Sequence, residues 1–112
     1  MKKELDTKFW VLNQNNSGGY YINNEIVKEY VIIEARNVEN CQQKAGNIFE
    51  DYRECCSCCG ERWDDDLLIE DESTKTPNIY AKEINLEAEL SPDDGNVVIY
   101  FIDGTQKYYR YK

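Results

Sequence analysis

The 112-residue sequence contains no histidine and two prolines, and it has no apolar run long enough to cross a membrane. Without histidine the usual general base is missing, and neither a Ser-His nor a Cys-His nucleophile pair can form. The first six residues, Met1–Asp6, carry charges in place of the apolar core of a signal peptide, and we expect them to be disordered. These features predict a non-enzymatic protein that stays in the cytoplasm where it is made, without contact to membranes.

Cationic residues are also scarce, since 13 Lys and Arg stand against 22 Asp and Glu and give a net charge of −9. Nucleic acids and anionic membranes attract proteins of the opposite charge, so direct nucleic-acid binding is not expected. An acidic surface keeps a protein soluble. It can also imitate the charge of DNA toward a DNA-binding protein.

The length fits a single domain, 1–112, with one modest core. The predicted elements are strands at 8–12, 30–35 and 78–84, an amphipathic helix at about 37–52 that begins at the N-cap Asn37, an acidic loop at 64–77 and a C-terminal hairpin at 96–111. Gly46 interrupts the helix, and a close helix–sheet contact is one reason for a glycine there. The pattern predicts an α+β fold in which the helix packs on one face of an antiparallel β-sheet.

The C-terminal hairpin contains Asp103-Gly104, a dipeptide typical of two-residue type I′ turns. Such a turn places Val98 opposite Tyr109. Both faces of this hairpin are apolar, so the second face must meet a helix, a loop or another subunit. We therefore expect a homo-oligomer, either a dimer or a higher assembly.

Five cysteines include two interleaved C-x-x-C pairs, Cys55 with Cys58 and Cys56 with Cys59. The second pair, followed by glycine, has the shape of a zinc knuckle, but a structural zinc site needs four ligands. The fifth cysteine, Cys41, lies on the apolar stripe of the helix as a core residue. The favoured interpretation is reduced, packed thiols with no metal or other cofactor. A zinc site on Cys56 and Cys59, with Cys55 and Cys58 as further thiolates, and a redox pair are the alternatives.

Two further segments are candidates for binding a ligand. Arg62 can hold a phosphate through two parallel hydrogen bonds, and Trp63 can stack on a base. A surface arginine beside a core tryptophan is the alternative. A polar loop can line a phosphate or sugar site with its amides, its hydroxyl and the backbone of two glycines. A hydrophilic hairpin loop without a ligand is the alternative. The loop consists of Asn13, Gln14, Asn15, Asn16, Ser17, Gly18, Gly19 and Tyr20.

The blocks N-Q-N-N-S-G-G and C-C-G-x-R-W, with the strand Tyr30–Ala35 between them, resemble a family of small uncharacterised bacteriophage proteins. The resemblance covers roughly the first 65 residues and implies a phage gene product that acts in the host cytoplasm, where small phage proteins of this kind often counter host defence. We accordingly expect a binding protein that sequesters a small nucleotide-type immune signal without turnover. An acidic inhibitor or DNA mimic that binds a host protein is the first alternative, and a zinc-stabilised adaptor is the second.

Overall fold

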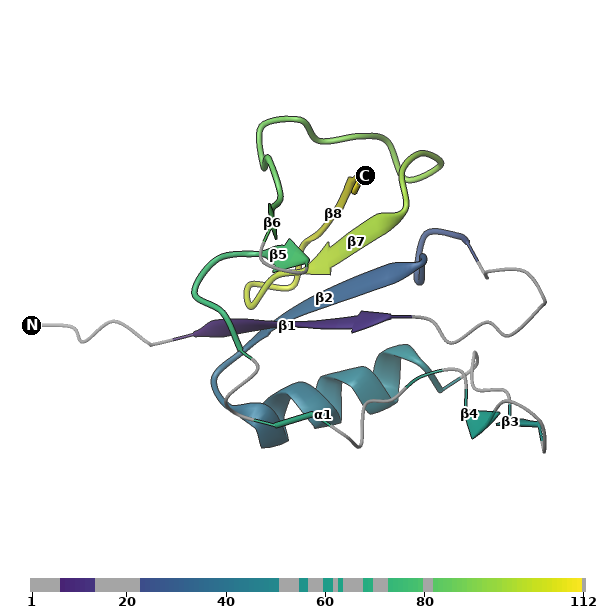
Figure 1. Cartoon of the computed structure of the whole chain (residues 1–112), viewed down its shortest axis with the longest axis vertical. Coiled ribbons are helices and arrows are strands. Elements are labelled where there is room, and N and C mark those ends of the chain that lie inside the picture. Colours follow the sequence, from purple (N-terminus) through teal and green to yellow (C-terminus); the bar gives the residue numbers. More distant parts are fainter. Residues whose placement is uncertain are drawn as a thin grey trace, which may run out of the picture.

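The computed structural model describes residues 7–13, 23–50, 55–56, 60–61, 63, 68–69, 73–79 and 82–111, with backbone only at 55–56 and 60–61. A four-stranded sheet in the order β1-β2-β7-β8 forms its centre, and α1 (Val38–Ile48) runs along one face (Figure 1). The strands of this sheet are β1 (Lys8–Asn13), β2 (Tyr30–Ala35), β7 (Val97–Tyr100) and β8 (Gln106–Tyr109). The shorter strands are β3 (Cys55–Cys56), β4 (Gly60–Glu61), β5 (Asn78–Ile79) and β6 (Lys82–Glu83), paired β3 with β4 and β5 with β6. The predicted α+β class is confirmed.

The central strand β2 pairs in two different directions. It runs antiparallel to β1, with Val31 opposite Leu12, and parallel to β7, with Val31 opposite Val98. The prediction of a purely antiparallel sheet is therefore wrong for the second pair. Parallel neighbours need a long crossover connection, which α1 and the segments after it provide. The nearly continuous apolar sequence of β2 fits a strand that is covered on both faces.

The C-terminal hairpin is present, but its register differs by one residue from the predicted one. Tyr108 lies opposite Val98, whereas the prediction placed Tyr109 opposite Val98. The Phe101 N–H donates to the Thr105 carbonyl at 2.9 Å, which encloses a loop of three residues in place of two. Gly104 closes this loop at φ +94°, as in a three-residue turn with a G1 bulge. The one-residue shift moves every side chain of one strand to the opposite face.

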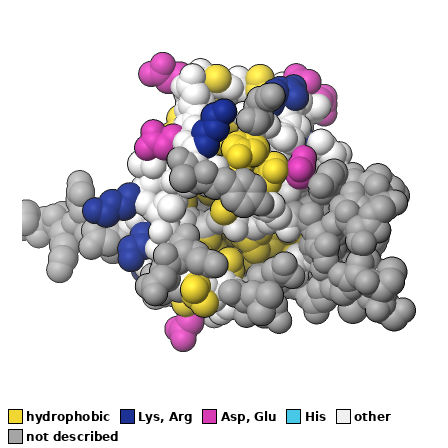
Figure 2. Space-filling model, in the orientation of Figure 1, with side chains coloured by type: hydrophobic (Ala, Val, Ile, Leu, Met, Phe, Trp, Pro, Cys, Tyr) yellow, Lys and Arg dark blue, Asp and Glu magenta, His cyan; other side chains and the backbone are white. Residues whose placement is uncertain are grey.

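Two hydrophobic clusters cover the two faces of the sheet. The first includes Trp10, Val31, Val98 and Tyr108 of the sheet with Cys41, Ala45 and Phe49 of the helical segment. The second includes Phe9, Ile32, Ile99 and Tyr109 of the sheet with Ile79 and Ile84. A segment of the same chain thus meets the second face, while the homo-oligomer stays a prediction. Figure 2 shows hydrophobic side chains near the middle of the visible face and charged ones around its edge.

Helix α1 begins as predicted at Asn37, whose side-chain oxygen accepts from the Asn40 N–H at 2.8 Å. Cys41 and Ala45 are fully buried against the sheet, so the prediction of Cys41 as a core residue is confirmed. Among the described residues, a Cβ added at Gly46 would meet nothing within 4 Å. The proposed close contact at this glycine is therefore wrong. The helix ends at Ile48, with Phe49 as its C-cap, so the predicted end at about residue 52 is wrong; residues 51–52 lie outside the described part.

The predicted acidic loop at 64–77 is described only in part, and the predicted disordered segment at 1–6 is not described. Residues 1–6 and most of 64–72 lie outside the described part. Thr74 forms a two-hydrogen-bond bridge with Phe9 on the outer edge of β1, at 2.7 and 2.9 Å. The helix that the described residues contain is too short and too polar to cross a membrane.

Candidate functional site

The predicted ligand-binding residues are only partly visible. Asn13 is exposed at the carboxyl end of β1, and Trp63 is fully buried. Residues 14–20 and Arg62 lie outside the described part. The end of β1 and the β3–β4 hairpin lie at the same end of the molecule (Figure 1). Whether they form one binding site stays a prediction.

Trp63 occupies the core in the structure. Its ring stacks on Phe49 with 4.1 Å between centroids and 4° between the planes, and it belongs to the same cluster as Leu12. One face of the indole is therefore taken by protein. Among the described residues no acceptor faces the Trp63 Nε1, whereas the Trp10 Nε1 donates to the Ile69 carbonyl at 3.0 Å. Burial of Trp63 matches the alternative of a core tryptophan.

The cysteine cluster is described only in its backbone at two positions. Cys55 pairs with Glu61 and Cys56 with Gly60, so a short hairpin carries the C-x-x-C segment. Cys58 and Cys59 lie outside the described part, and the zinc and redox alternatives stay predictions. Within the ranges described, no three metal-ligating side chains come together.

Lys28 is the buried charged side chain of the described part. Its Nζ donates to the Asn23 Oδ1 at 2.7 Å and lies 5.5 Å from the centre of the Tyr108 ring. Burial lowers the pKa of the Lys28 ammonium, while Asp93 and Asp94 act in the opposite direction. These contacts tie the segment before β2 to the sheet, so Lys28 has a structural role here.

An open groove of about 520 Å³ lies between the first half of α1 and the turn after β7. Its lining is mostly polar and comes from the β2–α1 junction, from α1 and from the hairpin turn. The lining residues are Arg36, Asn37, Glu39, Asn40, Gln43, Lys44 and Ile102. None of these was predicted to bind a ligand.

Hydrogen bonds to the backbone fix the polar wall of the groove. The Asn40 side-chain oxygen accepts from the Arg36 N–H at 3.2 Å, which joins the junction to the first turn of α1. The Lys44 Nζ donates to the Glu34 carbonyl at 2.9 Å, which directs this side chain toward the sheet. These contacts hold the side chains of Asn40 and Lys44 in place.

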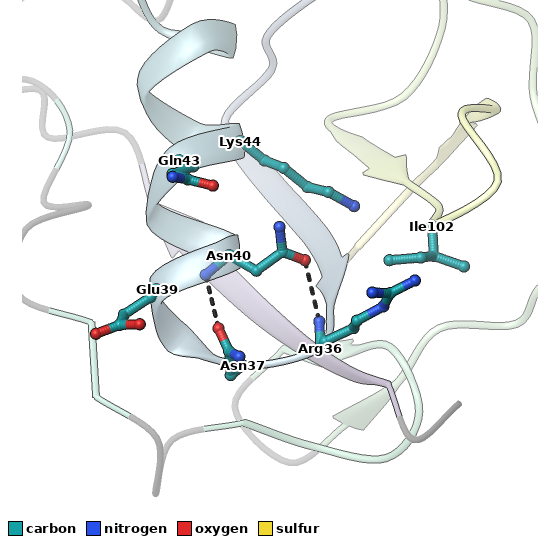
Figure 3. A pocket seen from close by; sticks show the side chains of 7 residues that line it. All are labelled: Arg36, Asn37, Glu39, Asn40, Gln43, Lys44 and Ile102. Atoms are coloured by element: carbon teal, nitrogen blue, oxygen red, sulfur yellow. Dashed lines mark hydrogen bonds between the residues drawn. The ribbon is translucent and has the colours of Figure 1, made fainter. Parts of the chain in front are cut away.

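The side chains divide into two groups around the helix (Figure 3). Arg36 and Lys44 extend toward Ile102, and the Asn40 amide lies between them. Glu39 points away from Ile102 on the other side of α1, and Gln43 lies over the helix in this view. The part of the groove that faces the hairpin therefore presents two cations, an amide and an apolar side chain. The lining also includes the Glu39 carboxylate, and the Glu34 carboxylate accepts from the Ile102 N–H, so the two cations stand beside two carboxylates in a chain with a net charge of −9.

Sequence reasoning missed this site, although part of its signal was present. Asn40 and Lys44 are four residues apart in α1, a spacing that places their side chains on one face of a helix. Arg36 precedes the N-cap Asn37, so helical spacing does not place it beside them. Ile102 is separated from them by more than half of the chain, so the fourth member could be found only from the fold.

A family model described as a domain of unknown function, DUF7296, matches residues 7–112. The chain belongs to the DUF7296 family. The DUF7296 match includes the four-stranded sheet, α1 and all seven residues of the groove. No curated protein and no solved structure matches the chain.

Proposed function

We propose that this protein binds a small phosphate-bearing anion of nucleotide type in the α1 groove. The supporting observation is that Arg36, Asn40 and Lys44 converge beside Ile102 in a chain with a net charge of −9. A guanidinium offers paired donors to phosphate oxygens, and an ammonium adds a compact positive charge. The apolar side chain gives a ring or sugar a surface to contact.

The chemistry of the groove favours binding without turnover. Its seven side chains include no hydroxyl and no thiol that could act as a nucleophile. Glu39, the carboxylate of this set, points away from the cationic side (Figure 3). Since the chain also has no histidine, the ligand should leave unchanged.

The overall charge supports a small ligand over a polymer. Charges beyond about 8 Å are screened at physiological ionic strength, so a compact anion senses mainly the groove. A nucleic acid would extend over acidic surface and be repelled. Two cations of one groove within a chain of net negative charge thus favour a mono- or dinucleotide over a polymer.

The biological setting of the proposal comes from the resemblance of the N-Q-N-N-S-G-G and C-C-G-x-R-W blocks to small bacteriophage proteins. In that setting the protein would act in the host cytoplasm and sequester a nucleotide signal of the host defence. Sequestration requires binding alone, which agrees with the chemistry of the groove.

Calorimetric titration with pyrophosphate and a panel of linear and cyclic nucleotides tests the proposal. The double variant R36A/K44A should bind the best ligand at least about tenfold more weakly, because it removes two charge-assisted contacts. The control K75A/R110A removes the same charge at exposed residues outside the groove and should bind like the wild type. Mass spectrometry should recover the ligand intact.

Three results would contradict the proposal. Binding that is absent across the panel, together with capture of one host protein, would favour the acidic inhibitor. Breakdown of a nucleotide would indicate an enzyme. Equal weakening in both double variants would show that only net charge matters and that the groove is not the site.

A further inference from the structure

Glu34 on β2 connects three separate segments around the groove. One carboxylate oxygen accepts from the Ile102 N–H at 2.9 Å, and the other accepts from the Thr7 hydroxyl. Its backbone carbonyl accepts from the Lys44 Nζ at 2.9 Å. A single residue therefore contacts the start of β1, the hairpin turn and the cationic side of α1.

The bond to Ile102 has a particular effect on the hairpin turn. Within the turn, the N–H groups of Phe101 and Gly104 donate to Thr105 and Phe101 carbonyls, which closes the loop on itself. The Ile102 N–H instead donates outward to Glu34. This bond ties the exposed tip of the hairpin to β2, and thereby sets the distance between the apolar wall of the groove and α1.

We infer that Glu34 is the positioning residue of the groove: its carboxylate holds Ile102, and its carbonyl holds Lys44, in the arrangement that receives a phosphate-bearing ligand. The inference rests on the proposed function. It has an unusual consequence, because a carboxylate next to an anion site repels the ligand. If its charge were its main effect, removing it would strengthen binding. If it positions the wall, removing it weakens binding.

Two substitutions separate these effects. E34Q removes the charge but keeps an oxygen that can accept from the Ile102 N–H, whereas E34A removes both. Positioning predicts that E34A binds pyrophosphate or the best nucleotide about tenfold more weakly, while E34Q binds at least as tightly as the wild type. The control E87A removes one negative charge at an exposed residue outside the groove and should leave the affinity unchanged.

Hydrogen exchange of the Ile102 amide gives a readout that does not need a ligand. Its protection should fall in E34A and persist in E34Q and in the control T7V, which removes only the Thr7 donor. Tighter binding by both E34A and E34Q, or unchanged Ile102 protection in E34A, would overturn the inference. If the wild type binds no phosphate compound, the proposed function fails. The anchoring of Ile102 by Glu34 is then still supported if the Ile102 amide loses protection in E34A but not in E34Q. Should E34A not fold, unprotected Ile102 in E34Q would count against the inference.

Discussion

Replacing Trp63 by alanine should strongly destabilise the fold, because the structure places this side chain in the core. The side chain is fully buried and its ring lies flat on Phe49 at 4.1 Å. Truncating a buried tryptophan costs about 3–5 kcal/mol, and the loss of an aromatic stack adds about 0.5–1.5 kcal/mol. Small domains have about 5–15 kcal/mol of total stability, so W63A should be marginally folded.

The cost is measured by urea unfolding followed by far-ultraviolet circular dichroism, fitted with a common m-value. W63F is the matched control, since it retains a ring against Phe49 and loses less volume than W63A; the indole N–H that it also removes has no acceptor among the described residues. W63F should cost clearly less than W63A, because it leaves a smaller cavity. A W63A cost below about 1 kcal/mol would refute the core assignment and revive the prediction that Trp63 stacks on a ligand.

Three further predictions follow from local geometry. G46A should stabilise the protein by about 1 kcal/mol and raise Tm by about 4 °C, since the added methyl meets open space in the helix; an unchanged Tm would contradict this. G95A should lower the free energy of unfolding in urea by more than about 2 kcal/mol. Gly95 has a φ of +82°, and an added Cβ would lie 2.3 Å from the Tyr109 carbonyl oxygen. A smaller loss would contradict this close approach of Gly95 to β8. Burial raises the pKa of the Tyr108 and Tyr109 phenols, so the contribution of these two groups to stability should be constant below about pH 10 and be lost as the pH rises above it. The alkaline loss of stability should be smaller in Y108F/Y109F.

The turn chemistry explains why the hairpin could be predicted but its register could not. Asp103-Gly104 is compatible with a two-residue turn, and its glycine equally fits the last position of a three-residue loop. Register is otherwise set by which side chains must be buried. Here both faces of Val97–Tyr100 are apolar and both are covered, so the hydrophobic pattern does not distinguish the two registers.

Local signals were sufficient for the helix and for the central strand. Asn37 and the spacing of Cys41 and Ala45 predict the start and the buried face of α1, because capping and periodicity act within a few residues. The parallel pairing of β2 with β7 joins segments far apart in the chain, and no local pattern encodes it. The same reason hides Ile102, which reaches the groove only through that pairing.

Because the groove has one wall from α1 and one from the hairpin, ligand binding there should stabilise the folded chain as a whole. At a concentration of 100 times Kd, a ligand that binds only the native state adds about 2.7 kcal/mol, or about 10 °C in Tm. A tenfold weaker variant such as R36A/K44A should retain about half of this stabilisation at the same concentration. A ligand held by 14–20 and Arg62 would instead raise Tm equally in both proteins, so differential scanning fluorimetry separates the groove from the site expected from the sequence.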